Sequence, residues 1–150
     1  MNIVILGCGR VGSTLARMMF KDGHNVTVID LQGEAFRRLG PRYKGNRIIG
    51  NGIDEDVMRR AGIENADVFV AVTQGDNRNI MASQIAQHVF HVPKVIARIY
   101  DPVRADRYRQ LGITTLCTTT IASGLIRDFV TRDEWGLKRD YSRDYLEMNV

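Results

Sequence analysis

The sequence predicts an α/β fold, a doubly wound parallel sheet of about six strands with helices on both faces. Apolar strand-like runs alternate with helix-like patterns from residue 2 to about residue 130, and this alternation is typical of a parallel sheet covered by helices. The strand-like runs are also continuously apolar, as expected where both faces of the sheet are buried.

Six strand–helix pairs are expected in chain order. Each strand is a short apolar run, and each helix shows apolar residues at helical spacing. Asp54 is placed to cap the third helix. Glycine or proline ends four of the helices, at Gly40-Pro41, Gly62, Pro93 and Gly112. The expected strands are Asn2–Leu6, Val26–Ile29, Arg47–Ile49, Asp67–Val72, Lys94–Ile99 and Thr114–Cys117. The expected helices are Val11–Phe20, Glu34–Leu39, Glu55–Ala61, Asp76–Val89, Val103–Leu111 and Ile121–Val130.

Length and composition indicate one globular domain. The chain has 150 residues, 44% hydrophobic and 25% charged, which is ordinary for a domain with a buried core. The pattern breaks down at Asp133, so we expect a domain over residues 1–132 and a polar linker or tail over 133–150, towards an absent C-terminal domain. No apolar run approaches the roughly 18 residues of a membrane helix. Two cysteines, Cys8 and Cys117, suit a reducing compartment, so a cytoplasmic location without direct membrane insertion is expected.

The charge is mildly basic. The formal net charge is +4; the tail over 133–150 carries five acids and three bases, which leaves +6 for the rest. No zinc-finger spacing or aromatic-plus-basic RNA motif is present, so neither a nucleic-acid partner nor a metal site is expected. The basic excess instead favours an anionic ligand.

A glycine cluster follows the first expected strand. Gly7, Gly9 and Gly12 fit the pattern G-x-G-x-x-G between a strand and a helix, the setting in which this motif binds a dinucleotide. The first glycine permits the turn, the second lets the backbone approach a pyrophosphate, and the third lets helix and strand pack closely. The helix beginning near Arg10 then directs its N–H groups at the phosphates. This pattern indicates a Rossmann-type fold.

An acid ends the second expected strand. Asp30 lies about 20 residues after the glycines, where a carboxylate accepts hydrogen bonds from the adenosine ribose. Leu31 and Gln32 supply no arginine for a 2′-phosphate. The expected cofactor is therefore an adenine nucleotide, NAD or NADH, ATP or ADP, rather than NADP.

Residues 1 to about 132 resemble the nucleotide-binding N-terminal domain of the regulators of potassium conductance, the RCK or KTN domains of the Trk/Ktr potassium-transport systems. The opening "MNIVILGCGRVGSTLA" with "VTVID" is shared with many dinucleotide folds. More specific are "GNGIDEDVMRRAGIENADVFVAVTQGDNRNIMASQIA", "KVIARIYDP" and "TTLCTTTIASGLIRDF". Asn51 departs from the family, which more often has Asp after the glycine.

The resemblance implies a regulatory subunit or domain that binds a nucleotide, changes conformation and gates a Trk/Ktr-type potassium channel or transporter. It also implies a location at the inner face of the cell membrane, and a homodimer or larger ring through the helix at 120–130. That helix has an apolar stripe that the fold could equally use for core packing. The stripe consists of Ile121, Leu125, Phe129 and Val130.

The expected nucleotide site combines motif and resemblance. Arg10 lies where the family senses the phosphate end of the nucleotide. Asp54 and Asp76 could instead simply cap helices, and Arg98 could either serve a phosphate or pair with Asp101. The expected site residues are Gly7, Cys8, Gly9, Arg10, Val11, Gly12, Asp30, Leu31, Asn51, Gly52, Ile53, Thr73, Asp76, Asn79 and Arg98.

Two enzyme classes share parts of this pattern. A dehydrogenase needs a substrate pocket and a proton donor near the nicotinamide, but Tyr43 and Tyr100 are each followed four residues later by arginine, not lysine. A methyltransferase also has a glycine-rich loop and a strand-end acid, but usually a longer chain. A non-enzymatic gating module is therefore the first expectation, and the cofactor domain of an NAD-dependent oxidoreductase is the alternative.

Overall fold

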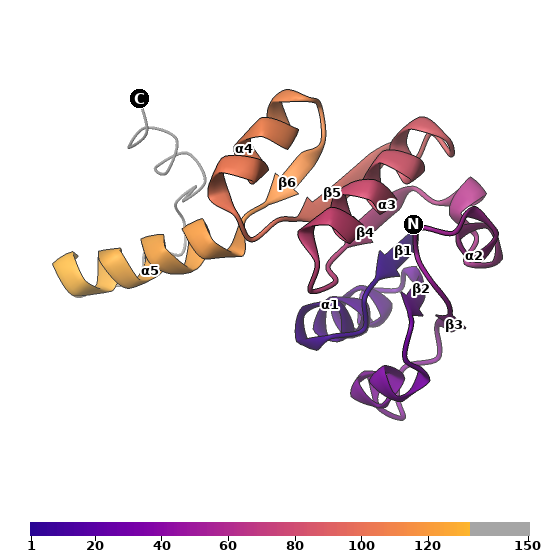
Figure 1. The fold of residues 1–150 in the computed structure, drawn as a ribbon. Helices are drawn as coiled ribbons and strands as arrows, with labels where there is room; N and C mark the ends of the chain where they lie inside the picture. The colour runs from indigo at the N-terminus through magenta and orange to yellow at the C-terminus, as the bar shows by residue number, and fades with distance from the viewer. Residues whose placement is uncertain (133–150) are drawn as a thin grey trace. The chain divides into compact units, whose positions relative to one another are not determined.

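The computed structural model describes residues 1–132 and divides the chain into two compact units, Met1–Arg98 and a second that begins at Ile99. The described residues contain six strands alternating with helices (Figure 1). The predicted doubly wound parallel sheet is confirmed. The predicted linker or tail at 133–150 lies outside the described residues.

The first unit is a five-stranded parallel sheet. Its strands are β1 (Asn2–Leu6), β2 (Asn25–Asp30), β3 (Asn46–Ile49), β4 (Val68–Ala71) and β5 (Lys94–Arg98). Their order is β3-β2-β1-β4-β5. The chain proceeds from β1 to one side and then returns to β4 on the other, so a topological switch point lies at the carboxyl end of β1, where doubly wound folds bind ligands.

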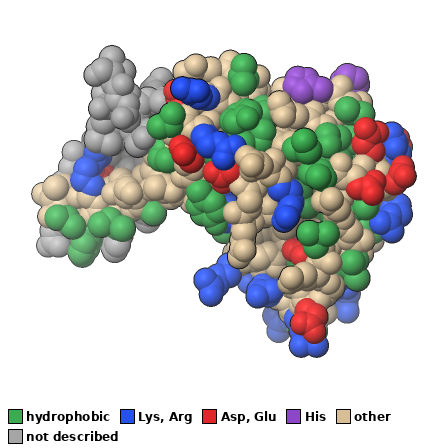
Figure 2. Space-filling model, in the orientation of Figure 1, with side chains coloured by type: hydrophobic (Ala, Val, Ile, Leu, Met, Phe, Trp, Pro, Cys, Tyr) green, Lys and Arg blue, Asp and Glu red, His purple; other side chains and the backbone are tan. Residues whose placement is uncertain are grey.

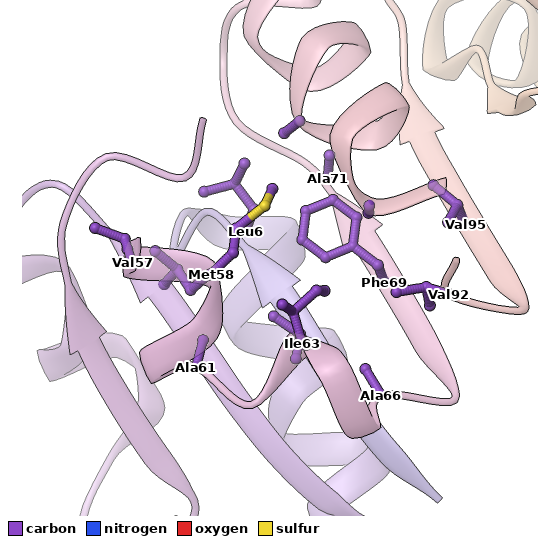
Figure 3. Close-up of a cluster of buried hydrophobic side chains, with 14 residues drawn as sticks. Leu6, Val57, Met58, Ala61, Ile63, Ala66, Phe69, Ala71, Val92 and Val95 are labelled. Carbon is purple, nitrogen blue, oxygen red and sulfur yellow. The ribbon is translucent and has the colours of Figure 1, made fainter. Parts of the chain in front are cut away.

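Helices cover both faces of this sheet. They are α1 (Arg10–Lys21), the 3₁₀ helix η1 (Gly33–Leu39), α2 (Glu55–Arg60), the 3₁₀ helix η2 (Ile63–Asn65) and α3 (Asp76–His88). On one face, α1 and η1 pack against side chains such as Ile5 and Val28. On the other, α2, η2 and α3 pack against Leu6 and Phe69, and Figure 3 shows these side chains converging. Both faces of β1, β2 and β4 are therefore apolar because both are buried, whereas the edge strand β3 is mostly exposed.

The second unit contains α4 (Pro102–Gln110), β6 (Thr114–Leu116) and α5 (Thr118–Arg132). Asp101 caps α4, because its Oδ1 accepts the N–H groups of Val103 at 2.9 Å and Arg104 at 3.1 Å. The N–H of Ile99 donates to the carbonyl of Leu116 at 3.1 Å. Within residues 1–132, no helix is both long and apolar enough to cross a bilayer.

Most element boundaries agree with the predicted ones to within one residue, and the exceptions have local causes. The segment after β2 is a 3₁₀ helix, and η2 was not expected. Helix α5 begins at Thr118, three residues before the predicted start. The prediction missed this first turn because its threonines are polar and show no apolar periodicity. Among the one-residue differences, α4 begins at Pro102 instead of Val103, since proline suits the first helical position.

Candidate nucleotide-binding site

The glycine turn connects β1 to α1 in a left-handed conformation. Gly7 has a φ of +104°, and its N–H donates to the carbonyl of Ile29 at 2.8 Å. A Cβ at Gly7 would lie 3.1 Å from the backbone nitrogen of Thr73. Both the backbone angle and the contact with the neighbouring strand's loop therefore require glycine here.

The next two glycines differ in what surrounds them. A Cβ at Gly12 would overlap the carbonyl oxygen of Gly7, so Gly12 permits the close packing of α1 on the turn. A Cβ at Gly9 would meet no atom within 4 Å. Gly9 is the N-cap of α1 and supplies no side-chain cap, so this residue leaves the first N–H groups of α1 uncapped. Such a helix end is suited to an anion.

Asp30 ties the end of β2 to the glycine turn. Its Oδ2 accepts the backbone N–H of Cys8 at 2.6 Å, and its Oδ1 accepts the N–H of Gln32 at 2.9 Å. A carboxylate offers about four acceptor positions, so both oxygens keep a lone pair for ribose hydroxyls. Asp30 thus has a structural role in the turn that its position in the sequence did not reveal.

Cys8 lies beneath the turn rather than in the ligand space. Its side chain is fully buried, and its Sγ donates to the carbonyl of Ala35 at 3.4 Å. Burial, followed by the negative charge of Asp30, raises the pKa of the Cys8 thiol to about 11. Because a thiolate is needed for reaction, Cys8 is a packing residue, and only its backbone N–H belongs to the site's bonding.

The loop after β3 supplies a second wall. Asn51 is exposed, and its Oδ1 accepts the N–H of Ile53 at 3.4 Å. A Cβ at Gly52 would overlap the side chain of Leu6, so glycine lets this loop approach β1. Asp54 caps α2 by accepting the N–H of Asp56 at 2.9 Å, which confirms its predicted helix-capping alternative.

Ile49 is not among the predicted site residues. This residue pairs in register with Asp30 and is 60% exposed, although it ends a strand in an apolar run. Leu31 is 50% exposed directly after Asp30. Two exposed apolar side chains therefore lie beside Asp30, and they could pack against an adenine ring. No local sequence pattern marks this exposure, because it depends on the register between β2 and β3.

Asn79 forms a buried network at the carboxyl ends of β4 and β5. Its Oδ1 accepts the N–H of Thr73 at 2.9 Å and the hydroxyl of Thr73 at 2.7 Å. Its Nδ2 donates to the carbonyl of Thr73 at 2.9 Å and to that of Arg98 at 2.8 Å. Asn79 is fully buried, so its amide shapes the loop that lies against Gly7.

Arg98 and Asp76 lie at the same edge of the sheet. Arg98 is 7% exposed, and its Nη2 donates to the carbonyl of Thr73 at 2.7 Å. Asp76 is the first residue of α3 and is half-buried; the N-cap is Gly75 and has no side-chain cap bond, so Asp76 is not the cap. Arg10 and Val11 are exposed at the start of α1.

A hollow lies at the opposite edge of the sheet. It measures about 400 Å³ and is lined by residues at the amino ends of β1, β2 and β3 and by the α2–η2 turn, including Asn2, Asn25, Lys44 and Gly62. None of the predicted site residues lines it. Within the described part of the chain, no three His, Cys, Asp or Glu side chains gather in a way that could hold a metal.

The fold, the glycine turn and the strand-end acid define a Rossmann-type domain of the nucleotide-binding class. The chain belongs to the TrkA-N domain family, whose family model matches residues 3–119.

Several known proteins resemble the chain. It is 53% identical over 118 residues to the Trk system potassium uptake protein TrkA of Streptomyces coelicolor, a match that covers 79% of this chain and 53% of that protein. It is 35% identical over 133 residues to a TrkA homolog of Methanothermobacter thermautotrophicus, covering 88% of this chain and 61% of that protein. The chain therefore spans 53% and 61% of the length of these two relatives.

Solved structures show the same fold. The TrkA-N domain of the inner membrane protein YbaL of Escherichia coli superposes with a TM-score of 0.76 at 18% identity, covering 85% of this chain and 95% of that one. The GsuK structure bound to ADP gives a TM-score of 0.74 at 20% identity, covering 88% of this chain and 34% of that one.

The raised pKa of Cys8 predicts a slow thiol. A shift from 9.0 to about 11 lowers the thiolate fraction near neutral pH about a hundredfold. Alkylation of the Cys8 peptide by iodoacetamide, followed by mass spectrometry, is expected to be at least that much slower in the folded chain than in guanidinium chloride, and to accelerate as the pH rises towards 11. Equal rates in both conditions would contradict the buried placement.

Proposed function

We propose that this chain is the adenine-nucleotide-binding regulatory domain of a potassium uptake system and does not catalyse a reaction. The nucleotide changes the domain's conformation, and that change controls a membrane channel or transporter of the Trk/Ktr type. The domain acts in the cytoplasm at the inner face of the membrane. Membership of the TrkA-N family supports the assignment to a potassium uptake system. The open space at Gly9 supports a bound nucleotide.

The proposed binding mode assigns a part of the nucleotide to each group of residues. The phosphates lie over Gly9 against the N–H groups of Arg10, Val11 and Gly12, where the helix end favours negative charge. The ribose hydroxyls donate to Asp30. The adenine packs against Leu31 and Ile49 and reaches the Asn51–Ile53 loop. Solved structures with this fold include GsuK bound to ADP and the GsuK channel bound to NAD, and either nucleotide fits this arrangement.

The remaining predicted residues hold the site in shape. Gly7 contacts the backbone of Thr73, and Asn79 and Arg98 fix that backbone through buried hydrogen bonds. A nucleotide that favours one arrangement of this edge shifts the population of the domain's states in proportion to its differential affinity. We assign Asp76 to the carboxyl edge of the sheet, where the ligand is proposed to bind, because it lies at the start of α3 after β4.

An NAD-dependent oxidoreductase remains the second candidate. The same glycine turn and acid would hold NAD in either case. The two are separated by their ligands, because a regulatory site responds to nucleotides that cannot transfer hydride. A thermal-shift panel of NAD, NADH, ATP, ADP and S-adenosylmethionine tests this, and stabilisation by ATP and ADP as well as by NAD would favour the regulatory domain over the oxidoreductase.

Substitution of Gly9 tests the phosphate site. Val at this position is expected to abolish ADP binding, measured by calorimetry, because its side chain fills the open space over the helix end. The φ of −72° at Gly9 is normal for any residue, so stability should fall by only about 1 kcal/mol, as for other poor N-caps. Gly12→Ala is the contrast: the new Cβ overlaps the Gly7 carbonyl, and the melting temperature should fall markedly. Unchanged ADP affinity in Gly9→Val would refute the site.

Arg10→Ala tests which end of the ligand is read. Arg10 is exposed beside the phosphate space, and one lost charge-assisted hydrogen bond is worth about 1.5–3 kcal/mol, or roughly ten- to a hundredfold in affinity. The affinity for ATP should therefore fall more than the affinity for ADP or AMP. Asp30→Asn should weaken all three alike, because it loosens both the ribose contact and the bond to Cys8. If Arg10→Ala weakened every ligand equally, the claim that Arg10 distinguishes phosphate number would fail.

Exposed apolar residues of α5 support a homodimer or larger ring. Ile126, Phe129 and Val130 are 59%, 42% and 76% exposed and lie on one helix face at spacings of three and four. The purified chain should be at least dimeric by light scattering at about tens of micromolar. Ile126→Asp with Phe129→Asp should yield monomers, whereas Leu111→Asp, at a residue 69% exposed elsewhere in the same unit, should not. A monomeric wild-type chain would contradict this.

A further inference from the structure

Positive charge is concentrated in one part of the first unit. Residues 10–47 carry eight Lys or Arg and three Asp or Glu, a net +5, whereas residues 48–98 carry five and six, a net −1. In Figure 2 the blue side chains gather over the region where Figure 1 places α1 and the segment after β2. We call this surface the basic face and define it by six exposed residues, Arg17, Lys21, Arg37, Arg38, Arg42 and Lys44.

The elements that carry the basic face pack together. Helix α1 and η1 share a buried cluster that includes Ala16, Ala35 and Leu39. Phe20 of α1 lies with its ring centroid 5.2 Å from that of Tyr43, which joins the loop after η1 to the same cluster. Arg10 is adjacent on α1 but is excluded from the definition, because the proposed nucleotide site uses it.

The charges of this face are not neutralised by the protein. Among the described residues, only Arg37 of the six forms an ion pair, with Glu34 at 3.9 Å, and both side chains are more than four-fifths exposed. In contrast, Arg59 of α2 contacts Glu55 at 2.9 Å, Asp56 at 3.2 Å and Glu64 at 3.5 Å. The six cations therefore have little role in holding the fold, and their charge is exposed to solvent, where it can attract an anionic partner.

We propose that the basic face binds the anionic phospholipid headgroups of a bilayer surface. The cations are spread over exposed helix and loop positions instead of converging on one small anion, and clusters of four to eight Lys or Arg are typical of contacts with anionic lipids. The described aromatic rings of this region are Phe20, Phe36 and Tyr43. Phe20 and Tyr43 pack on each other, Tyr43 is only 2% exposed, and Phe36 is partly buried against the same core cluster. Rings so placed cannot stack on bases, which disfavours single-stranded nucleic acid.

The choice of lipid over a protein partner rests on the proposed function, which places the domain beside a membrane transport protein. The cytoplasmic loops of such proteins are enriched in Lys and Arg and would repel this face, whereas the surrounding headgroups would attract it. The attraction falls off within a Debye length, so it acts only when the face is held close to the membrane. Binding to lipid would then orient the domain beneath its transporter.

Vesicle flotation of the 150-residue chain tests the proposal without nucleotide or transporter. At low salt the chain should bind phosphatidylglycerol-containing vesicles and not phosphatidylcholine vesicles, and high salt should release it. Each neutralised residue should lower the partition coefficient onto the vesicles about fivefold. The partition coefficient should therefore fall about a hundredfold in the triple variant Arg37→Gln, Arg38→Gln, Arg42→Gln. A second triple, Arg17→Gln, Lys21→Gln, Lys44→Gln, gives the same test if the first does not fold.

A matched control removes three cations outside the face, at Arg60, Arg78 and Lys94, all exposed. It should keep most of the vesicle binding, and the basic-face variants should keep their ADP affinity. The proposal is overturned if the wild type does not bind, if the control loses as much as the face variants, or if a single-stranded oligonucleotide binds more tightly than the vesicles at equal salt. If the wild-type chain did not bind ADP, that result would instead count against the proposed function.

Discussion

The hydrogen bond between the Asp30 carboxylate and the backbone N–H of Cys8, at 2.6 Å, is the interaction on which the site depends. It connects the end of β2 to the glycine turn at the end of β1. The same carboxylate accepts the N–H of Gln32, so one side chain fixes two loops. A charge-assisted bond of this kind is about twice as strong as a neutral one. The turn is therefore already formed before any ligand arrives.

The second support of the turn comes from the other side of β1. Gly7 lies against Thr73, and the amide of Asn79 holds the backbone of Thr73 with its own oxygen and nitrogen. A buried amide with this many partners is rigid, because breaking any bond would leave a polar group unsatisfied. The turn is thus held between β2 and β4, with the N-terminus of α1 opening between them.

The sheet and its carboxyl edge could be predicted from the sequence because both depend on local residue patterns. Strand–helix alternation and the glycine spacing identified the fold, the turn and Asp30. Features that depend on contacts across the sheet were not predictable from local patterns. The capping of Cys8 by Asp30 and the burial of the Asn79 amide depend on strand order, and the exposure of Ile49 depends on its register with Asp30. The gathering of cations on one face likewise required the packing of η1 on α1.

The central claim is that a nucleotide binds at the carboxyl edge of the sheet, over the N-terminus of α1. An amide chemical-shift titration of the isotopically labelled chain with ADP tests it most directly. The account predicts that the largest shifts fall on the backbone amides of residues 9–12, with further shifts at Gln32 and Asn51. It would be contradicted if the largest shifts fell instead on Asn2, Asn25 and Gly62, which line the hollow at the opposite edge, or if no amide of residues 9–12 moved at saturation.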